Sequence, residues 1–530
     1  MTAFDWEFPY LSRRLPLLAR NVVATAQPLA AQAGLSMMLR GGNAVDAALA
    51  TAIALTVVEP VSNGVGSDAF AMVWDGTTLH GLNASGRSPL AWVPGRFAGR
   101  RAMPETGWDS VTVPGAVSAW AALSARFGRL PFATLFEPAI AYARQGFPVS
   151  PVVAMKWRKQ VPLFADQPGF AEAFLPGGRA PAAGETFALP ALAQTLDAIA
   201  DTRGEAFYRG SLAEALVAHA AAHGGALTLA DLDAHAVEWV APIGIDYRGY
   251  TLHELPPSGQ GIAALIALGI LAHHDLAAHP VDSAASLHLQ IEAMKLAFAD
   301  VHRHVADPRA MTAEVTSLLD AEYLAQRARE IDPDRARSPL PGRLSGGGTV
   351  YLTAADAEGM MVSYIQSNYG GFGSGVVVPG TGISLQNRGS GFTLERGHPN
   401  EVGPGKRPFH TIIPAFVTRN GVPVMSFGVM GGAMQPQGHV QIMVRLADYR
   451  QNPQAACDAP RWRVRDGGAV EFEAGVEAQT VARLVRMGHR VAEGDAGSYF
   501  DFGAGQFIYR LADGYFAASD PRRDGQAVGF

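Results

Sequence analysis

Cysteine is nearly absent from this chain, which has a single one, Cys457, among 530 residues. No disulfide can form within the chain, and a zinc site built on several cysteines is excluded. Cys457 lies in the segment NPQAACDAP, where no histidine and no helper group form an obvious constellation with it. We therefore interpret Cys457 as a small core or surface residue rather than a nucleophile.

An excess of positive charge is also missing, because 42 lysines and arginines face 48 aspartates and glutamates, for a net charge of -6. Such a chain offers no basic field for nucleic acid or for an anionic membrane surface. The most apolar stretch, residues 44–58, includes Asp46 and is too short to span a bilayer, so we expect a buried helix there. The first residues, MTAFDWEFPYLSRRLPLLARNVV, lack the continuous apolar core of a secretory signal. We therefore expect a cytoplasmic protein without nucleic-acid or membrane partners.

What the sequence does contain is an ordinary globular composition, with 48% apolar and 17% charged residues, enough for a large core. Its length predicts three or four domains at about 150 residues each, although large α/β folds often break that rule. Residues 116–340 are mostly helical in pattern, whereas residues 349–430 form short apolar runs between glycines and prolines. The polar, proline-bearing segment 332–348 separates the two. We predict a large helix-rich part, residues 1–348, and a small strand-rich part, residues 349–530.

Three glycines stand directly before Thr349, which begins an alternating run typical of a β-hairpin. A threonine at a chain terminus carries its own base, because its α-amino group has a pKa of about 7.7–8.0. Thr349 is internal, so this chemistry requires cleavage of the Gly348–Thr349 bond. Glycine adopts backbone angles denied to other residues, and strain stored there favours attack of the Thr349 hydroxyl on the Gly348 carbonyl. An acyl shift and hydrolysis would leave two chains. A flexible linker before a strand is the alternative interpretation of the same residues.

Further motifs follow one another along the whole chain, and they are VVATAQPLAAQAGLSMMLRGGNAVDAALATAIALTVVEPVSNGVGSDAFAMVWDG, SVTVPGAVSAW, ELPPSGQG, EAMKLAFADVHRHVADP, FGSGVVVPGTGISLQN, PGKRPFHTIIPAF and VMGGAMQPQGHVQ. In this order and spacing the chain resembles the γ-glutamyltransferase (glutathione hydrolase) family of N-terminal-nucleophile hydrolases. It is most similar to the cytoplasmic branch without a lid, because its loop TLERGHPNEVGPG is shorter than the usual lid loop. The resemblance implies an α+β fold, a four-layer αββα sandwich formed from two autoprocessed chains.

The resemblance also implies roles for particular residues. Thr349 aligns with the nucleophile at the new terminus, and Gly348–Thr349 is the implied cleavage site. Ser367 stands where the family has a threonine that hydrogen-bonds the nucleophile. Gly431 and Gly432 match the paired glycines whose backbone N–H groups form an oxyanion hole. Considered alone, these two glycines are more typical of a turn.

Several donor-pocket positions depart from the family pattern. The acidic residue that holds the donor α-amino group is replaced by Gly391, in the segment SLQNRGSGF. Arg388 occupies a place usually held by glutamine, and the adjacent serine pair becomes His410-Thr411. The donor-site asparagine is replaced by Tyr369, which follows Asn368.

Arginines remain in this pocket. Arg87, in NASGRSP, is a near match, shifted by two positions, to the family arginine that binds the donor α-carboxylate. We list Arg87, Arg388, Asn368, Tyr369, His410 and Thr411 as predicted substrate-binding residues. For Arg87, Arg388 and Arg407, surface solvation or pairing with core acids is the alternative, and His410 is equally compatible with a structural role.

The predicted function is hydrolysis of a small-molecule amide, with transfer to an amine as a lesser activity. The resemblance suggests γ-glutamyl groups from glutathione-like amides. An alternative fits the retained arginines and the missing acid at least as well. It is an acidic acyl group without an α-amino group, as in a glutaryl-type acylase or an oxamate amidohydrolase. No cofactor and no metal are expected, since amide hydrolysis needs a nucleophile, a proton shuttle and an oxyanion hole. The two cleavage products are expected to stay together as a heterodimer, and further dimerisation is left open.

Other function classes have weaker support. Residues 63–69, NGVGSDA, fit a dinucleotide fingerprint, but they follow a helix and precede a strand, which is the wrong order for a Rossmann fold. His302 and His304 resemble a metal motif, but positions i and i+2 of a helix point to different faces. An unprocessed, non-catalytic binding protein of the same fold is the main rival, because Val350 replaces the threonine that often follows the nucleophile.

Overall fold

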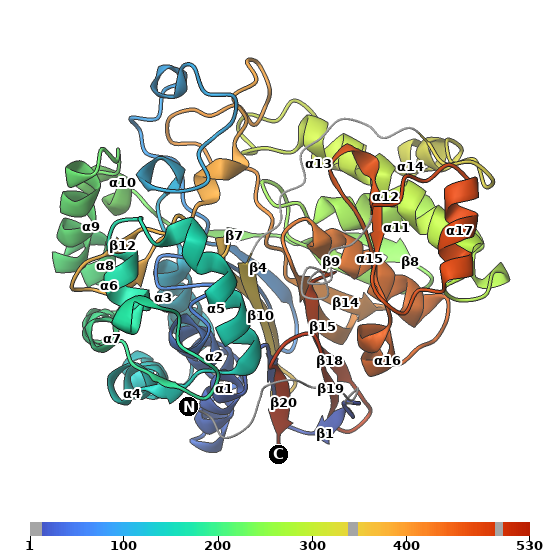
Figure 1. Ribbon diagram of the computed structural model, residues 1–530. Coiled ribbons are helices and arrows are strands. Elements are labelled where there is room, and N and C mark those ends of the chain that lie inside the picture. The colour runs from blue at the N-terminus through green and yellow to red at the C-terminus, as the bar shows by residue number, and fades with distance from the viewer. Residues whose placement is uncertain (1–12, 338–347, 493–501) are drawn as a thin grey trace.

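The computed structural model describes residues 13–337, 348–492 and 502–530, and it stacks two β-sheets between two layers of helices (Figure 1). Each sheet has seven strands. The first sheet contains, in spatial order, β1 (Leu17–Ala19), β19 (Tyr515–Ser519), β18 (Ala504–Arg510), β15 (Val422–Met430), β14 (Ala415–Arg419), β9 (Tyr250–Glu254) and β8 (Ile243–Tyr247). The second contains β20 (Gln526–Gly529), β2 (Val22–Thr25), β10 (Gly348–Ala355), β11 (Met361–Tyr369), β3 (Asp68–Trp74), β4 (Leu79–Asn83) and β7 (Glu238–Val240).

Strands from before and after the Gly348–Thr349 bond are interleaved in both sheets. In the second sheet, β2 lies between β20 and β10, and β11 pairs with β3. In the first sheet, β1 pairs with β19, and β14 pairs with β9. All of these pairs are antiparallel. The predicted parts 1–348 and 349–530 therefore share both sheets, so the bond between them divides the polypeptide without dividing the fold.

One helical layer covers the outer face of the second sheet, at the side of α1 to α5 in Figure 1. The helices before β7 are α1 (Pro28–Leu39), α2 (Ala44–Val58), α3 (Ala116–Phe127), α4 (Glu137–Gln145), α5 (Pro151–Phe164), α6 (Phe170–Phe174), α7 (Pro190–Thr202), α8 (Glu205–Arg209), α9 (Ser211–Ala222) and α10 (Leu229–Asp233). The predicted buried helix is confirmed as α2, whose residues are all buried. Asn43 caps it and forms a capping box with Asp46, which satisfies the first N–H groups.

The other helical layer covers the first sheet on the opposite side of the molecule (Figure 1). Its helices are α11 (Ile262–Leu271), α12 (Ala284–His304), α13 (Val315–Leu318), α14 (Ala321–Ala328), α15 (Met434–Ala447), α16 (Pro453–Asp458) and α17 (Ala478–Arg486). Every residue of α11 is buried, because this helix lies between α12, α15 and strand β8. The later part of the chain therefore contributes helices as well as strands.

The two sheets pack face to face, and apolar side chains fill the space between them. This inner core includes Phe70, Tyr351, Ile365, Phe416 and Ile508. The hydroxyls of Thr353 in β10 and Ser426 in β15 lie 2.6 Å apart and connect the sheets directly. This packing confirms the predicted four-layer αββα architecture. Within the described residues, no helix combines the length and apolar character needed to cross a bilayer.

Smaller elements complete the description. Three short antiparallel hairpins join β5 (Phe147–Pro148) to β6 (Thr186–Phe187), β12 (Val377–Val378) to β13 (Ile383–Ser384), and β16 (Trp462–Val464) to β17 (Val470–Phe472). Among the 3₁₀ turns, η6 (Arg388–Gly391) follows β13 and brings the Arg388 side chain close to Ser367 in β11. Two of the three glycines before Thr349 lie outside the described residues.

Candidate active site

Thr349 lies at an irregularity in the pairing of β10 with β11. Gly348 is opposite Tyr369, and Val350 is opposite Gln366, so Thr349 alone faces two residues of the partner strand. The bulged strand ends at Tyr369, whose φ of 74° is unusual for a residue with a side chain. A Cβ on Gly348 would lie 3.1 Å from the Cα of Gly371 and 3.2 Å from the carbonyl oxygen of Val61. This close approach of two backbone segments favours glycine. The bulge aims the side chain of Thr349 into the protein, where it is buried.

The hydroxyl of Ser367 connects the residues on both sides of the Gly348–Thr349 bond. Its Oγ lies 3.0 Å from Thr349 Oγ1, and it donates to the Gly348 carbonyl oxygen at 2.8 Å. The same Oγ accepts from the Tyr369 amide at 2.7 Å. A hydroxyl has one proton, so a Ser367 that donates to Gly348 must accept from Thr349. Ser367 therefore polarises the carbonyl of the Gly348–Thr349 bond and orients the Thr349 oxygen beside it.

Arg388 extends this arrangement away from Thr349. Its Nη1 donates to Thr411 Oγ1 at 2.8 Å, and its Nη2 lies 3.4 Å from Ser367 Oγ. The guanidinium stacks on the ring of Tyr369, 4.3 Å from its centroid. Burial lowers the pKa of Arg388 to about 10, against the opposing effect of Asp68 and Tyr369, so the side chain stays charged at neutral pH. Among the described residues, Arg388 Nε has no hydrogen-bond partner.

His410 is held in a structural position. Its Nδ1 accepts from the Ile412 amide at 3.4 Å, which assigns the ring proton to Nε2, and Nε2 donates to Asp68 Oδ2 at 3.1 Å. Its ring packs against Phe70, with 4.6 Å between centroids. Burial, followed by the nearby Arg388, keeps the pKa of His410 well below its usual value. No described contact joins His410 to Thr349, so the geometry favours a structural histidine over a base.

Gln260 connects Thr411 to the paired glycines. Its Nε2 donates to the Thr411 carbonyl at 2.7 Å and to the Gly432 carbonyl at 2.9 Å. Gly431 and Gly432, between β15 and α15, have φ angles of 124° and 62°, which glycine adopts without strain. Within the described chain neither glycine N–H has an acceptor. These free amides lie beside the N-terminus of α15, where negative charge is favoured.

These contacts define a continuous set, which we call the Thr349 network. It runs through hydrogen-bonding contacts in this order: Thr349, Ser367, Arg388, Thr411, Gln260 and Gly432. The network combines a hydroxyl nucleophile, a cation and unpaired backbone donors. That combination can attack a carbonyl carbon and stabilise the oxyanion that forms on it.

The other predicted substrate-binding residues have other partners. Arg87 pairs through Nη1 with Asp307 at 2.8 Å and through Nη2 with Glu238 at 3.1 Å. Arg407 contacts the same Glu238 at 2.5 Å. Substrate binding by Arg87 stays a prediction, and the geometry favours Arg388 for that role. Asn368 turns away from the nucleophile, since its Oδ1 accepts from the Ser67 hydroxyl at 2.7 Å.

A second buried polar group, which we call the His489 cluster, consists of His288, Glu292, Lys295 and His489. Lys295 Nζ lies 3.3 Å from His489 Nδ1. Because an ammonium group can only donate, His489 Nδ1 accepts, and the ring proton of neutral His489 is on Nε2. His489 then donates to His288 Nδ1 at 2.8 Å, and His288 Nε2 donates to the Asp332 carbonyl at 2.8 Å. Burial, Lys295 and His288 lower the pKa of His489 to about 3.

Glu292 completes the cluster. Its Oε1 accepts from Lys295 at 2.8 Å, and its Oε2 accepts from the Arg337 amide at 2.9 Å. The ligand atoms of His288, Glu292 and His489 lie within 4.8 Å of one another, which is a spacing that a metal ion could use. However, the four ring nitrogens already have partners, and the ammonium of Lys295 already supplies a positive charge. The cluster therefore joins α12 to the segments on both sides of Gly348–Thr349 without requiring a metal.

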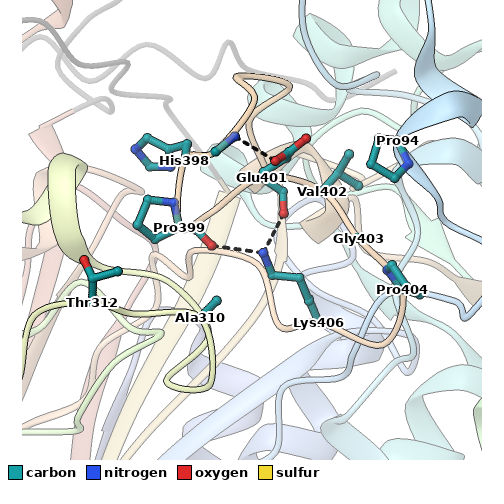
Figure 2. Close-up of a pocket in the computed structure, with 11 residues that line it drawn as sticks. Pro94, Ala310, Thr312, His398, Pro399, Glu401, Val402, Gly403, Pro404 and Lys406 are labelled. Carbon is teal, nitrogen blue, oxygen red and sulfur yellow. Dashed lines mark hydrogen bonds between the residues drawn. The ribbon is translucent and has the colours of Figure 1, made fainter.

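A cavity of about 300 Å³ borders the connection between η6 and His410 (Figure 2). Its lining consists of Pro94, Ala310, Thr312, Gly397, His398, Pro399, Glu401, Val402, Gly403, Pro404 and Lys406. Lys406 Nζ donates to the carbonyls of Pro399 and Glu401 at 2.9 and 2.7 Å, so backbone oxygens bind its ammonium group. Asn400, from the same loop, donates to the Gly391 carbonyl at 2.7 Å. The cavity thus lies beside the predicted donor segments, and none of its lining residues belongs to the Thr349 network.

Two site residues were not predicted. Asp68 lies in NGVGSDA, a pattern that indicates only a dinucleotide fingerprint, and Gln260 lies in the motif ELPPSGQG, which predicts no role for it. An isolated aspartate before an apolar run and a glutamine between glycines were the available signals. Neither indicates a partner, because both partners lie more than a hundred residues away along the chain.

Comparisons with known proteins agree with this geometry. A family model described as Gamma-glutamyltranspeptidase matches residues 30–530. The Glutathione hydrolase-like YwrD proenzyme of Bacillus subtilis is 38% identical over 520 residues, covering 96% of this chain and 98% of the relative. The Oxamate amidohydrolase proenzyme of Klebsiella pneumoniae is 37% identical over 525 residues, covering 95% and 97%. The crystal structure of a cephalosporin acylase from Bacillus halodurans superposes with a TM-score of 0.95 at 47% identity, covering 100% of this chain and 99% of that one.

Proposed function

The chain belongs to the gamma-glutamyltranspeptidase family, and from that premise we propose that it cuts its own Gly348–Thr349 bond and then hydrolyses amides of an acidic acyl group. The observation that carries this proposal is the contact of Ser367 with both the Thr349 hydroxyl and the Gly348 carbonyl. One side chain thus contacts both the proposed nucleophile and the carbonyl that it would attack, which supports self-cleavage at this bond. The product is a two-chain amidohydrolase with Thr349 at the head of β10.

After cleavage, Thr349 supplies both nucleophile and base. Its free amine takes the proton of its own hydroxyl, and Oγ1 attacks the substrate carbonyl. The unpaired N–H groups of Gly431 and Gly432 would then bind the developing oxyanion; donors of this kind are worth about 3–4 kcal/mol each in related chemistry. Water hydrolyses the acyl-enzyme in the second half of the reaction, with the amine again acting as base.

The acyl group is proposed from the charges around Thr349. Arg388 is a cation within two hydrogen-bonding contacts of the nucleophile, and its Nε has no hydrogen-bond partner among the described residues. A carboxylate on the acyl group is the natural partner of a buried guanidinium. The position that holds the donor amine in γ-glutamyl transferases is Gly391 here, which supports an acyl group without an α-amino group. The names of two relatives, an oxamate amidohydrolase and a cephalosporin acylase, are consistent with that choice.

Thr349 and Arg388 are only 2% and 0% exposed in the continuous chain. A substrate would therefore reach them only after the Gly348–Thr349 bond is cut and the site opens. Before that change the chain would be an inactive precursor.

Intact mass spectrometry under denaturing conditions tests the first step. We expect wild type to give two chains separated between Gly348 and Thr349, and Thr349→Ala to remain whole. Thr349→Ser is the matched control, because it keeps a hydroxyl and should still cleave. The cleaved protein would then be assayed with oxamate, glutaryl anilide and γ-glutamyl anilide. A wild-type chain that stays intact after long incubation would favour a non-catalytic binding protein of the same fold.

A further inference from the structure

A loose ion pair lies directly behind the Thr349 network. Asp68 Oδ2 is 3.9 Å from Arg388 Nε, which is beyond hydrogen-bond distance, although both side chains are completely buried. Asp68 is also the residue opposite Ser367 in the pairing of β3 with β11. The carboxyl therefore lies one strand away from the residue that contacts Thr349.

The surroundings of Asp68 leave its charge only partly compensated. Its Oδ1 accepts from the Gly86 amide at 3.3 Å, and its Oδ2 accepts from His410 Nε2 at 3.1 Å. The charged or titratable groups facing it are Arg388 from η6, Arg407 and His410 from the following loop, and Tyr208 from α8. Burial raises the pKa of Asp68 to about 7, against the opposing effect of Arg388.

Among the described residues, Arg388 is the only cation that both belongs to the Thr349 network and approaches Asp68. Its two Nη atoms are used by Thr411 and Ser367, and its Nε faces Asp68 without a hydrogen bond. An ionised Asp68 offsets the charge of Arg388. A protonated Asp68 leaves that charge for another anion.

We propose that Asp68 is a positioning residue that sets specificity through Arg388, by taking up one proton when the carboxylate of an acyl group binds. This inference rests on the proposed function and adds to it the means by which an acidic acyl group is recognised. In a dry site, two carboxylates that share one guanidinium repel each other, so one of them accepts a proton. That proton comes from solvent and goes to a carboxylate oxygen of Asp68, and it returns to solvent when the acid leaves.

The consequence is a pH dependence confined to acidic substrates. Below a pH of about 7, Asp68 is neutral and Arg388 can pair with the substrate. Above that pH, Asp68 is charged, and binding requires uptake of a proton at increasing cost. One linked proton changes an apparent affinity by at most about tenfold per pH unit. An uncharged substrate gains nothing from Arg388 and should not show this effect.

A ratio of two substrates isolates the effect from the titration of Thr349. Glutaryl p-nitroanilide and its carbamoyl isostere, 4-carbamoylbutyryl p-nitroanilide, differ only in the terminal carboxylate. The Thr349 amine acts on both, so it cancels in the ratio of their kcat/KM values. We expect this ratio to fall between about pH 7 and 8.5 in wild type, approaching about tenfold per pH unit, mainly through KM. In Asp68→Asn the ratio should be nearly constant over the same range.

An unchanged slope in Asp68→Asn, or a constant ratio in wild type, would overturn the inference. Mass spectrometry of Asp68→Asn first shows whether it has cleaved. If it has not, the wild-type enzyme still decides the question, by calorimetry of glutarate binding at about pH 8.5, where free Asp68 is almost fully ionised, in buffers of different ionisation enthalpy. Close to one proton taken up per glutarate supports the inference, and none overturns it. Failure of wild type to hydrolyse either anilide or oxamate after cleavage would instead count against the proposed function.

Discussion

The Thr349 network and the His489 cluster are both buried, polar and assembled from residues on both sides of Gly348–Thr349, yet they differ in how completely their polar atoms are paired. In the His489 cluster, every side-chain nitrogen and carboxylate oxygen has a partner, and the protons can be ordered in one direction from Lys295 to Asp332. In the Thr349 network, Arg388 Nε has no hydrogen-bond partner among the described residues. The N–H groups of Gly432 and of the adjacent Gly431 have no acceptor there either.

This difference separates two uses of buried polarity. Leaving a buried donor unpaired costs about 1–3 kcal/mol, so a folded protein keeps such donors only where something else repays the cost. A ligand oxygen would do so in the Thr349 network. The His489 cluster has no unpaired polar atom left to bind a ligand. Its four side chains fix α12 against the segment that contains Asp332 and Arg337 and the segment that contains His489. We infer that one is a reaction site and the other a structural joint.

Removing the cation of the His489 cluster is the most stringent test of whether this cluster is structural. In Lys295→Met, the carboxylate of Glu292 and the Nδ1 of His489 lose a buried partner, and we expect stability to fall by about 3–5 kcal/mol. Thermal and urea unfolding of the cleaved protein would measure the loss. Because the cluster is structural in our interpretation, kcat of the folded fraction should be unchanged. Lys159→Met, at an exposed position, is the matched control. A fall in kcat without a loss of stability would contradict the comparison.

In the Thr349 network, we expect substitution of Gln260 to lower kcat rather than stability, and by a smaller free energy. Gln260→Met is similar in size but cannot donate to the carbonyls of Thr411 and Gly432. The Thr411 carbonyl would lose its donor, and the Gly432 carbonyl would keep only the Gln435 amide. This loss should reduce kcat by about tenfold to a hundredfold, since about 1–3 kcal/mol of positioning is lost. KM should change little, and steady-state kinetics would separate the two. Gln290→Met, a buried glutamine in α12, is the control. Equal effects of the two substitutions on kcat would mean that Gln260 has no special role.

The smallest expected effect sharpens the interpretation of the His489 cluster. Its histidine nitrogens are all engaged by hydrogen bonds, so dialysis against a strong chelator should leave the unfolding temperature unchanged. Differential scanning calorimetry before and after dialysis makes the measurement. A lowered transition that zinc restores would show that a metal ion displaces Lys295 and that the cluster is a binding site after all.

Local features of the sequence predicted local features of the fold. The helix expected at residues 44–58 and the hairpin expected after Gly348 both lie where their residue patterns place them. The nucleophile candidate also came from a local pattern. In contrast, the partners of Arg87, the pairing of Asp68 with His410 and the bridge made by Gln260 depend on contacts between residues that are far apart in the chain. No pattern of a few residues encodes such contacts, because they exist only once both sheets have assembled.

The interleaving of strands in the two sheets has a consequence for the order of the chain itself. The last residue, Phe530, is hydrogen-bonded to Arg20 and Asn21, and Arg14 donates to the carbonyl of Gly525, so the two ends of the described chain are neighbours. Joining them through a short linker and opening the chain between Gly348 and Thr349 would give a circular permutant with the same strand order in space. Its second residue would be Thr349, which methionine removal would expose as a terminus. Such a protein would have Thr349 at its N-terminus without self-cleavage. Self-cleavage would then be required by the order of the natural chain and not by the fold.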